Sequence, residues 1–403
     1  MVYIIKKDGT KEEFDANKIK RAVNKSAGRV MYRFTDDEIN FICKYATDRA
    51  EAMSRERKGG KIMIQDMHNI VEGALEQVNP AVAKSYRDYR NYKVDFIHMM
   101  DEVYTKSQSI RYIGDKSNAN TDSALVATKR SLIFNELNKE LYRKFFMNRN
   151  ELQACKDGYI YIHDQSARLD TMNCCLFDVG SVLRGGFEMG NVWYNEPKTL
   201  DTAFDVMGDI ILSTAAQQYG GFTVPEVDKI LSPYAQKSYN KYYEEFLKYS
   251  DPSWEGREEK GRVYAWEKVC RDCDQGWQGI EYKLNTVGSS RGDYPFVTVT
   301  LGLGTGRFEK MISKSLLKVH MGGQGKAGHK KPVLFPKIVF LYDEEIHGDG
   351  KECEDVFEAG VACSAKTMYP DWLSMSGQGY ISSMYKKYKK VISPMGCRAF
   401  LSP

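Results

Sequence analysis

The first 95 residues combine short alternating runs with helical stripes, a pattern typical of a small α+β domain. The stretch VYIIKKDGTKEEF predicts two short strands joined by a turn at Asp8 and Gly9. Further along, Thr35 and Glu38 form a capping-box pattern that predicts a helix start. The next stripe has apolar residues at i, i+3, i+4, i+7 and i+8, namely Met67, Ile70, Val71, Ala74 and Leu75. Pro80 then opens a last helix, so we expect a hairpin followed by four helices.

After residue 95, the stretches with helical periodicity become longer. Residues 96–117 show no clear periodicity, and we interpret them as a linker. From residue 118 onward, long helical stretches alternate with short apolar runs, of which PFVTVTLGLG and VLFPKIVFLYD are the clearest strands. Strands separated by long helices are typical of α/β domains with a layered or barrel sheet. The sequence therefore predicts two domains, 1–95 and 118–403, joined by that linker.

Composition narrows the class of protein. The net charge is only +4 over 403 residues, which does not favour nucleic acid as a general partner. The apolar runs fall short of a membrane span, and the N-terminus lacks the apolar region of a secretory signal. Nine cysteines without such a signal indicate reduced thiols. We expect a cytoplasmic protein that contacts neither membrane nor nucleic acid.

Several stretches carry candidate chemistry, each with a structural alternative. Lys6 and Lys7 lead into a glycine turn, and Lys18 follows in the first turn of a helix, which suits either phosphate binding or a plain surface hairpin. The basic, glycine-rich stretch 322–331 allows the same two interpretations. In QQYGG, Gln218 and a glycine of close approach could line a site, or the helix could simply end there.

The cysteines, too, allow more than one interpretation when each is considered alone. Cys174 and Cys175 are adjacent, which fits a redox feature but also small buried residues. Cys270 and Cys273 form a CxxC motif with no second pair at zinc-ligand spacing, so we predict no metal site in this chain. Cys397 stands on a Pro-Met-Gly-Cys turn, where it is either displayed for reaction or incidental.

A resemblance to a known domain changes the reading of residues 1–95. They resemble an ATP-cone, the regulatory nucleotide-binding domain found at the start of many ribonucleotide reductases. Its pattern matches Lys6, Lys7, Asp8, Gly9, Glu12, Lys18 and Ile19. Lys7 stands where arginine is commoner, which keeps the charge but loses the bidentate fork. The resemblance implies ATP and dATP as effectors.

The remaining motifs occur in the order expected of one family. They are NANTDS (118–123), IYIHD (160–164), NCCLFD (173–178), QYGGFT (218–223), PFVTVTLGLGT (295–305), LFPKIVF (334–340), KTMYPD (366–371) and SPMGCRAFL (393–401). Together they resemble the anaerobic, class III ribonucleoside-triphosphate reductases, which are glycyl-radical enzymes. The resemblance implies an α/β fold: a ten-stranded α/β barrel of two antiparallel halves with a finger loop inside, incomplete here after the finger-loop cysteine.

The same resemblance assigns roles to residues. Cys397 matches the finger-loop cysteine that becomes a thiyl radical and abstracts the 3′ hydrogen of the ribose. Cys174 matches the cysteine on the opposite side that gives hydrogen as the 2′ hydroxyl leaves as water. Cys175 is displaced by one position, so in a strand it would point the other way, and we interpret it as structural. We expect four residues to line the substrate site: Asn173, His163, Gln218 and Met395.

Members of this family continue past the finger loop to a glycyl-radical motif preceded by paired CxxC zinc ligands, and this sequence contains neither. We therefore expect a partial chain, inactive alone, whose missing C-terminal segment carries the glycyl radical and zinc. The family's partners are ribonucleoside triphosphates, a radical-SAM activating enzyme, a second copy of the chain in a homodimer, and formate or a small redox protein as reductant. The expected location is the cytoplasm of a bacterium or phage-infected cell.

Two alternatives remain at this point. The first is a non-catalytic nucleotide-binding fragment of a split or interrupted reductase. The second is another glycyl-radical enzyme, such as a relative of pyruvate formate-lyase. Those enzymes usually carry adjacent cysteines on the finger loop and no ATP-cone, whereas the loop here has one cysteine.

Overall fold

The computed structural model describes residues 2–6, 8–57, 60–113, 125–168, 172–286, 288, 292–388 and 390–394. The chain divides into two compact units, Met1–Thr105 and Lys106–Pro403. Each unit is described by itself below.

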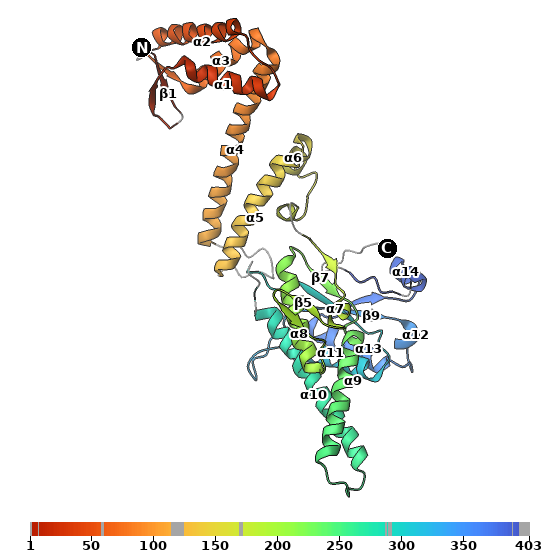
Figure 1. Ribbon diagram of the computed structural model, residues 1–403. Helices are drawn as coiled ribbons and strands as arrows, with labels where there is room; N and C mark the ends of the chain where they lie inside the picture. Colours follow the sequence, from red (N-terminus) through yellow and green to blue (C-terminus); the bar gives the residue numbers. More distant parts are fainter. Residues whose placement is uncertain are drawn as a thin grey trace. The chain divides into compact units, whose positions relative to one another are not determined.

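The first unit is a three-stranded sheet with helices packed on it (Figure 1). The strands are β1 (Tyr3–Ile5), β2 (Lys11–Glu13) and β3 (Lys61–Met63), in the order β2-β1-β3. The helices are α1 (Ala16–Arg29), α2 (Asp36–Glu56), α3 (Ile64–Val78) and the first part of α4 (Pro80–Ile113).

The structure confirms most of the predicted elements of this unit. β1 and β2 pair antiparallel around the turn at Asp8 and Gly9, and the Thr35–Glu38 capping box is formed at the start of α2. The predicted stripe on α3 is buried in the unit's core. The expectation of a bare hairpin was wrong, because β3 adds a third strand, parallel to β1. Three residues are too short a run for alternation to show.

The predicted linker, 96–117, is helical as far as Ile113. Neither glycine nor proline occurs between residues 81 and 113, so nothing in the backbone breaks the helix that Pro80 begins. α4 therefore runs across the division between the two units, and the domain limits drawn from the sequence remain predictions.

The second unit contains most of the chain. Its elements, after the end of α4, are α5 (Val126–Phe145), α6 (Arg149–Lys156), the short 3-10 helix η1 (Gln165–Ala167), β4 (Cys175–Leu176), α7 (Val179–Leu183), β5 (Phe187–Met189), β6 (Val192–Tyr194), α8 (Leu200–Gln217), β7 (Phe222–Val224), α9 (Val227–Tyr249), α10 (Arg257–Thr286), β8 (Val297–Leu301), α11 (Arg307–Gly322), β9 (Lys337–Tyr342), α12 (Glu344–His347), α13 (Glu354–Thr367), β10 (Asp371–Ser374) and α14 (Tyr380–Tyr388).

A five-stranded parallel sheet organises this unit, in the order β10-β9-β8-β7-β4. Helices connect its successive strands, as parallel pairing requires. The predicted α/β class is thus confirmed. The described strands of this sheet number five of the ten that the resemblance implies, and the closed barrel remains a prediction.

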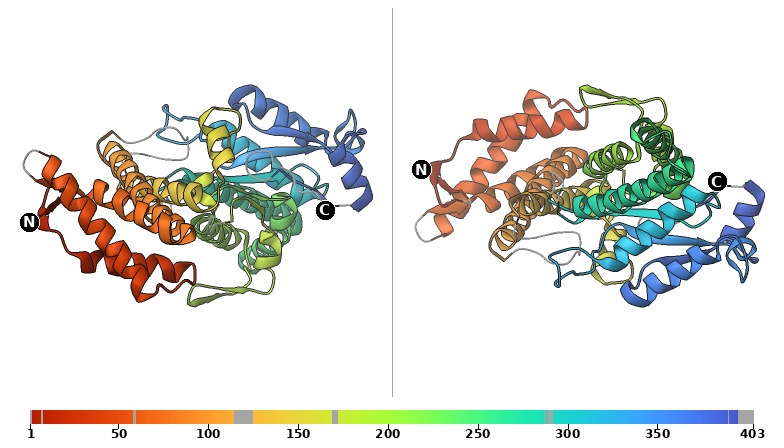
Figure 2. Two further views of the ribbon diagram at one scale, coloured as in Figure 1. Left: turned by 90° about the horizontal axis from the view of Figure 1, so that it is seen from above. Right: turned by 90° about the horizontal axis from the view of Figure 1, so that it is seen from below.

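The two faces of the sheet differ in what covers them. On one face, Val297, Val299 and Leu301 of β8 belong to the main core beneath the helices. There α10 packs against α8, α9 and α11, which Figure 2 shows in green and cyan. Thr298 and Thr300 alternate with these valines and leucine, so they point to the opposite face, where they are also buried. We call this opposite face the threonine face; it carries Thr223 of β7, Thr298 and Thr300.

Among the described residues, no helix combines the length and the apolar character needed to cross a membrane.

Candidate functional site

The start of β4 and the start of β7 approach each other very closely. The N–H of Gly220 donates to the carbonyl oxygen of Asn173 at 2.7 Å. A Cβ added at Gly220 would lie 2.4 Å from that oxygen and 2.7 Å from Sγ of Cys174. Only glycine can occupy this position without displacing the strand beside it. The sequence-predicted glycine of close approach therefore lies against Asn173 and Cys174.

Alternation separates the two adjacent cysteines. Cys175 pairs in register with Phe222 and packs against the main core on the helix-covered face. Leu176 pairs with Thr223, which belongs to the threonine face. Cys174 lies one residue before β4, and extending the alternation of the strand to it predicts that it faces the threonine side.

Gln218 is buried where α8 ends, beside these residues. Its Nε2 donates to Sγ of Cys175 at 2.7 Å and contacts Sδ of Met172 at 3.6 Å. Its Oε1 is buried and makes no hydrogen bond with the described residues. Gln218 thus holds Cys175, and among the described residues its Oε1 has no hydrogen-bond partner.

His163, which we expect to line the substrate site, has an exposed side chain. The side chain is 72% exposed, and its Nδ1 lies 2.6 Å from Oδ2 of Asp164. The apolar run before it forms no strand, and Tyr159 and Tyr161 are exposed. Asp164 adopts the left-handed backbone region, with φ of 53°, and turns the chain there. Its carboxylate also accepts from Nδ2 of Asn173 at 3.1 Å, so His163 reaches the site only through Asp164.

The end of the described chain returns to the sheet. Thr223 is fully buried in β7, and its hydroxyl donates to the carbonyl oxygen of Pro394. Ser393 is buried as well, and its hydroxyl makes no hydrogen bond with the described part of the chain. Cys397 and Met395 lie outside the described residues. The bond from Thr223 fixes Pro394 on the strand that neighbours β4.

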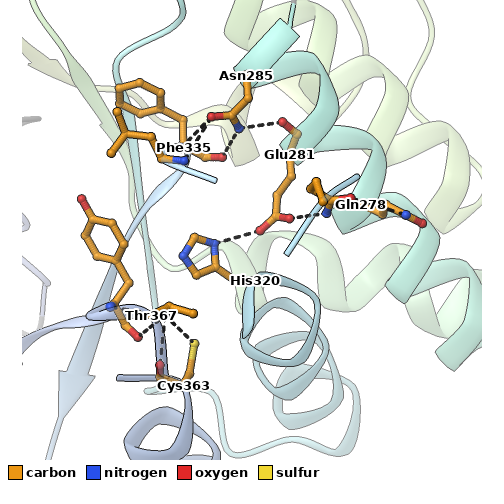
Figure 3. Close-up of polar contacts among 10 residues, drawn as sticks. Gln278, Glu281, Asn285, His320, Phe335, Cys363 and Thr367 are labelled. Atoms are coloured by element: carbon orange, nitrogen blue, oxygen red, sulfur yellow. Dashed lines mark hydrogen bonds and ion pairs between the residues drawn. The ribbon is translucent and has the colours of Figure 1, made fainter. Parts of the chain in front are cut away.

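A buried polar network holds the segment ahead of β9 on the helix-covered side (Figure 3). Glu281 of α10 is completely buried; its carboxylate lies 2.9 Å from Nδ1 of His320 and accepts from Gln324. One turn further, Asn285 bonds the backbone of Leu334 and Phe335. No local pattern predicts this network, because its members lie on three separate stretches of chain, 281–285, 320–324 and 334–335.

At the opposite end of the strands, a buried carboxylate holds the glycine-rich turn after β8. Oδ2 of Asp228 accepts from the N–H groups of Gly302 and Gly304, at 3.1 and 3.3 Å. Burial raises the pKa of this carboxyl group, and the hydrogen bonds from the backbone oppose that rise. His347 donates from Nε2 to the carbonyl oxygen of Gly302 at 2.9 Å, and burial lowers its pKa. Both residues escaped sequence reasoning.

In the first unit, two of the residues predicted to bind nucleotide, Lys6 and Lys18, form ion pairs with the carboxylate of Glu12. Glu12 lies 2.8 Å from Nζ of Lys6 and is also paired with Lys18. Gly9 has φ of +81° at the tip of the hairpin, whereas Ile19 is buried in the core. Lys7 lies outside the described residues. The structure therefore brings two cations together and gives Ile19 a packing role.

Comparison with known families adds the decisive observation. The model of the family described as anaerobic ribonucleoside-triphosphate reductase matches residues 117–403, and that of the ATP cone domain matches residues 2–94. The chain belongs to the anaerobic ribonucleoside-triphosphate reductase family.

Several relatives carry the same name. The anaerobic ribonucleoside-triphosphate reductase of Haemophilus influenzae is 32% identical over 409 residues, which cover 99% of this chain and 55% of the relative. That of Enterobacteria phage T4 is 36% identical over 289 residues, 71% of this chain and 45% of the relative. Among solved structures, the anaerobic ribonucleotide reductase from Thermotoga maritima in complex with dATP and CTP gives a TM-score of 0.43 at 15% identity, covering 70% of this chain and 50% of that one. The chain spans about half the length of these curated reductases.

The CxxC pair of this family member lies on α10. Cys273 is fully buried and Cys270 partly so. Burial raises the pKa of both thiols, which disfavours the thiolate needed for metal binding or attack. Within the described ranges, the side chains of His, Cys, Asp and Glu form no group of three or more that could hold a metal ion.

Proposed function

We propose that this chain is the N-terminal part of an anaerobic reductase that converts ribonucleoside triphosphates to 2′-deoxyribonucleoside triphosphates. One observation carries the proposal: Pro394 is bonded to Thr223 of β7, and Cys174 lies beside Gly220, just before the same strand begins. Cys397 is only three positions after Pro394 in the sequence, a stretch of chain that reaches at most about 11 Å. Of the two thiols assigned by family resemblance, Cys174 thus lies beside the start of β7, and Cys397 follows three positions after a residue bonded to β7.

The chemistry assigned to this pair divides between two hydrogen transfers. A thiyl radical at Cys397 takes the 3′ hydrogen of the ribose, and Cys174 supplies hydrogen as the 2′ hydroxyl leaves as water. The electrons consumed come from formate or a small redox protein. A radical survives only where water and other quenchers are excluded, which fits a face lined by buried threonines. In this proposal, the polar side chains of Gln218 and Asn173 line the substrate site beside the ribose.

The remaining parts of the mechanism belong to partners of the chain. The proposal places the stored glycyl radical and its neighbouring zinc on a C-terminal segment outside this sequence, and assigns radical generation to a radical-SAM activating enzyme. It further assigns a homodimeric assembly and a cytoplasmic location. The family relationship and the chain's share of its relatives' length support this division.

Effector control is proposed for the first unit. Lys6 and Lys18 converge on Glu12 at the hairpin and the start of α1, and a bound triphosphate would compete with that carboxylate for the two cations. The match to the ATP cone domain supports ATP and dATP as the ligands.

The test uses this chain together with a C-terminal reductase segment, after anaerobic activation. Deoxynucleotide formation is measured for the wild type and for Cys397→Ala, Cys174→Ala and, as a matched control, Cys155→Ala on α6. The first two variants should lose all turnover, and the control should retain it. Sustained turnover by Cys397→Ala or Cys174→Ala contradicts the proposal.

The match to the ATP cone domain also fits a second candidate, a nucleotide-binding protein without catalysis. Calorimetric titration of the whole chain with ATP and dATP, beside a Lys6→Ala/Lys18→Ala variant, tests that candidate. Binding without turnover in the complemented assay supports it, whereas turnover excludes it.

A further inference from the structure

The backbone of Phe335 needs partners that the sheet does not provide. Phe335 is 1% exposed, and it lies two residues before β9 begins at Lys337. A buried backbone N–H or C=O without a hydrogen bond is costly, so these groups must be satisfied elsewhere.

The carboxamide of Asn285 provides both partners. Its Oδ1 accepts from the N–H of Phe335 at 3.2 Å, and its Nδ2 donates to the carbonyl oxygen of Phe335 at 2.6 Å. The same Nδ2 donates to the backbone oxygen of Glu281 at 2.7 Å. Asn285 thus acts as a one-residue substitute for a neighbouring strand, as Figure 3 shows.

From Phe335 the contacts lead to the strands that carry the site. The ring of Phe335 packs edge-on against the ring of Phe296, with centroids 5.3 Å apart. Phe296 in turn lies over Gly221, where an added Cβ would be 2.3 Å from Cδ1 of the ring. The carbonyl oxygen of Phe296 also accepts from the N–H of Phe222 at 3.1 Å. Phe296 therefore fixes the backbone of residues 221 and 222 by two contacts, its ring against Gly221 and its carbonyl oxygen bonded to Phe222.

We propose that Asn285 is a positioning residue for Cys174. It holds Phe335 against Phe296, Phe296 sets the start of β7, and Gly220 closes on Asn173 and Cys174. The inference rests on the proposed function, in which Cys174 gives hydrogen to the substrate. Asn285 acts on Cys174 through these packed groups.

The test measures the reactivity of one thiol in the whole chain. The alkylation rate of Cys174 by iodoacetamide under native conditions is followed by peptide mass spectrometry, with Cys43 of the first unit as internal reference. Asn285→Asp replaces the donor Nδ2 by an oxygen that repels the carbonyls of Phe335 and Glu281. We expect the Cys174 rate to rise about tenfold, with faster amide exchange in residues 218–224, because the local structure opens more often.

Two further variants separate positioning from general stability. Leu231→Ala removes a buried side chain of α9, so it should lower the unfolding midpoint at least as much as Asn285→Asp while leaving the Cys174 rate within about twofold. Phe335→Leu keeps the backbone bonds but loosens the ring contact; it should raise the rate by an intermediate factor and serves if Asn285→Asp does not fold. An unchanged Cys174 rate in a folded Asn285→Asp or Phe335→Leu chain overturns the proposal.

The readout does not depend on turnover, so failure of the proposed function and failure of this inference are distinguishable. In the complemented enzyme, Asn285→Asp should lower kcat, with or without a change in KM, because the hydrogen donor Cys174 moves. A change in KM alone also contradicts the assignment.

Discussion

The two ends of the parallel sheet are held by different kinds of contact. Where the strands begin, neutral groups meet at very short range: Gly220 lies against Asn173, and Asn285 bonds the backbone of Phe335. Where the strands end, ionisable side chains hold the backbone, since Asp228 and His347 are both hydrogen-bonded to Gly302. The proposed thiol Cys174 is at the first end. Titrating groups also lie near the first end, where Asp164 accepts from Asn173 and Glu281 contacts His320, but there the backbone itself is held by neutral groups.

The largest effect should come from breaking the close approach where the strands begin. In Gly220→Ala the new Cβ would overlap the carbonyl oxygen of Asn173 at 2.4 Å, which we expect to lower the free energy of unfolding by about 3 kcal/mol. It should also displace Cys174 and abolish turnover in the complemented assay. Gly279→Ala on α10 is the control, because open space surrounds that position, and it should stabilise the chain by about 0.5–1 kcal/mol. Urea unfolding of both variants measures the difference, and equal midpoints would contradict the argument.

A somewhat smaller effect is expected from removing the buried carboxylate where the strands end. Asp228→Ala leaves the N–H groups of Gly302 and Gly304 without their acceptor. We expect a loss of about 2 kcal/mol, because the cost of the unpaired groups exceeds what is regained by no longer burying a carboxylate. The exposed Asp205→Ala on α8 should change stability by less than about 0.5 kcal/mol. If Asp228→Ala is as stable as this control in urea, Asp228 does not hold the turn.

The pH dependence of stability should follow His347. Burial lowers its pKa in the folded chain, so below the usual value of about 6.5 the unfolded chain binds a proton that the folded chain does not. The contribution of His347 is therefore complete above that pH and falls as the solution is acidified, by at most about 1.4 kcal/mol per pH unit. Unfolding midpoints at pH 7.5 and 5.5 should differ less in His347→Gln than in the wild type. The exposed loop variant His329→Gln controls for the loss of a histidine, and identical slopes in all three chains would exclude this role.

Comparing the two ends also shows which features of the fold could be predicted from the sequence. Local patterns predicted the strands β8 and β9, the hairpin at Gly9 and the Thr35 capping box, because each depends on residues close in the chain. The short run of β3 and the exposed position of His163 were not predictable in this way. Three residues show no period, and the burial of an alternating run depends on which segment packs over it.

The site was predictable only in part, for the same reason. Family motifs singled out Cys174 and the glycines at 220 and 221, whereas Thr223, Asp228 and Asn285 gave no local signal. Each of these three bonds a partner far away in sequence, at Pro394, Gly302 and Phe335. A threonine in a strand, or an asparagine on a helix, carries no mark of such a partner until the chain is folded.

The smallest effect should come from the capping residue at the end of β9. Oδ1 of Asp343 accepts from the N–H of Glu345 at 3.2 Å and from the hydroxyl of Ser376 at 2.9 Å, which joins α12 to the segment after β10. Asp343→Ala should cost about 1 kcal/mol, the usual value of an N-cap, and the exposed Asp349→Ala should cost nearly nothing. Because these bonds lie where the strands end, the Cys174 alkylation rate should not change in either variant. A faster Cys174 reaction in Asp343→Ala would show that the two ends of the sheet are coupled, and the contrast between them would then fail.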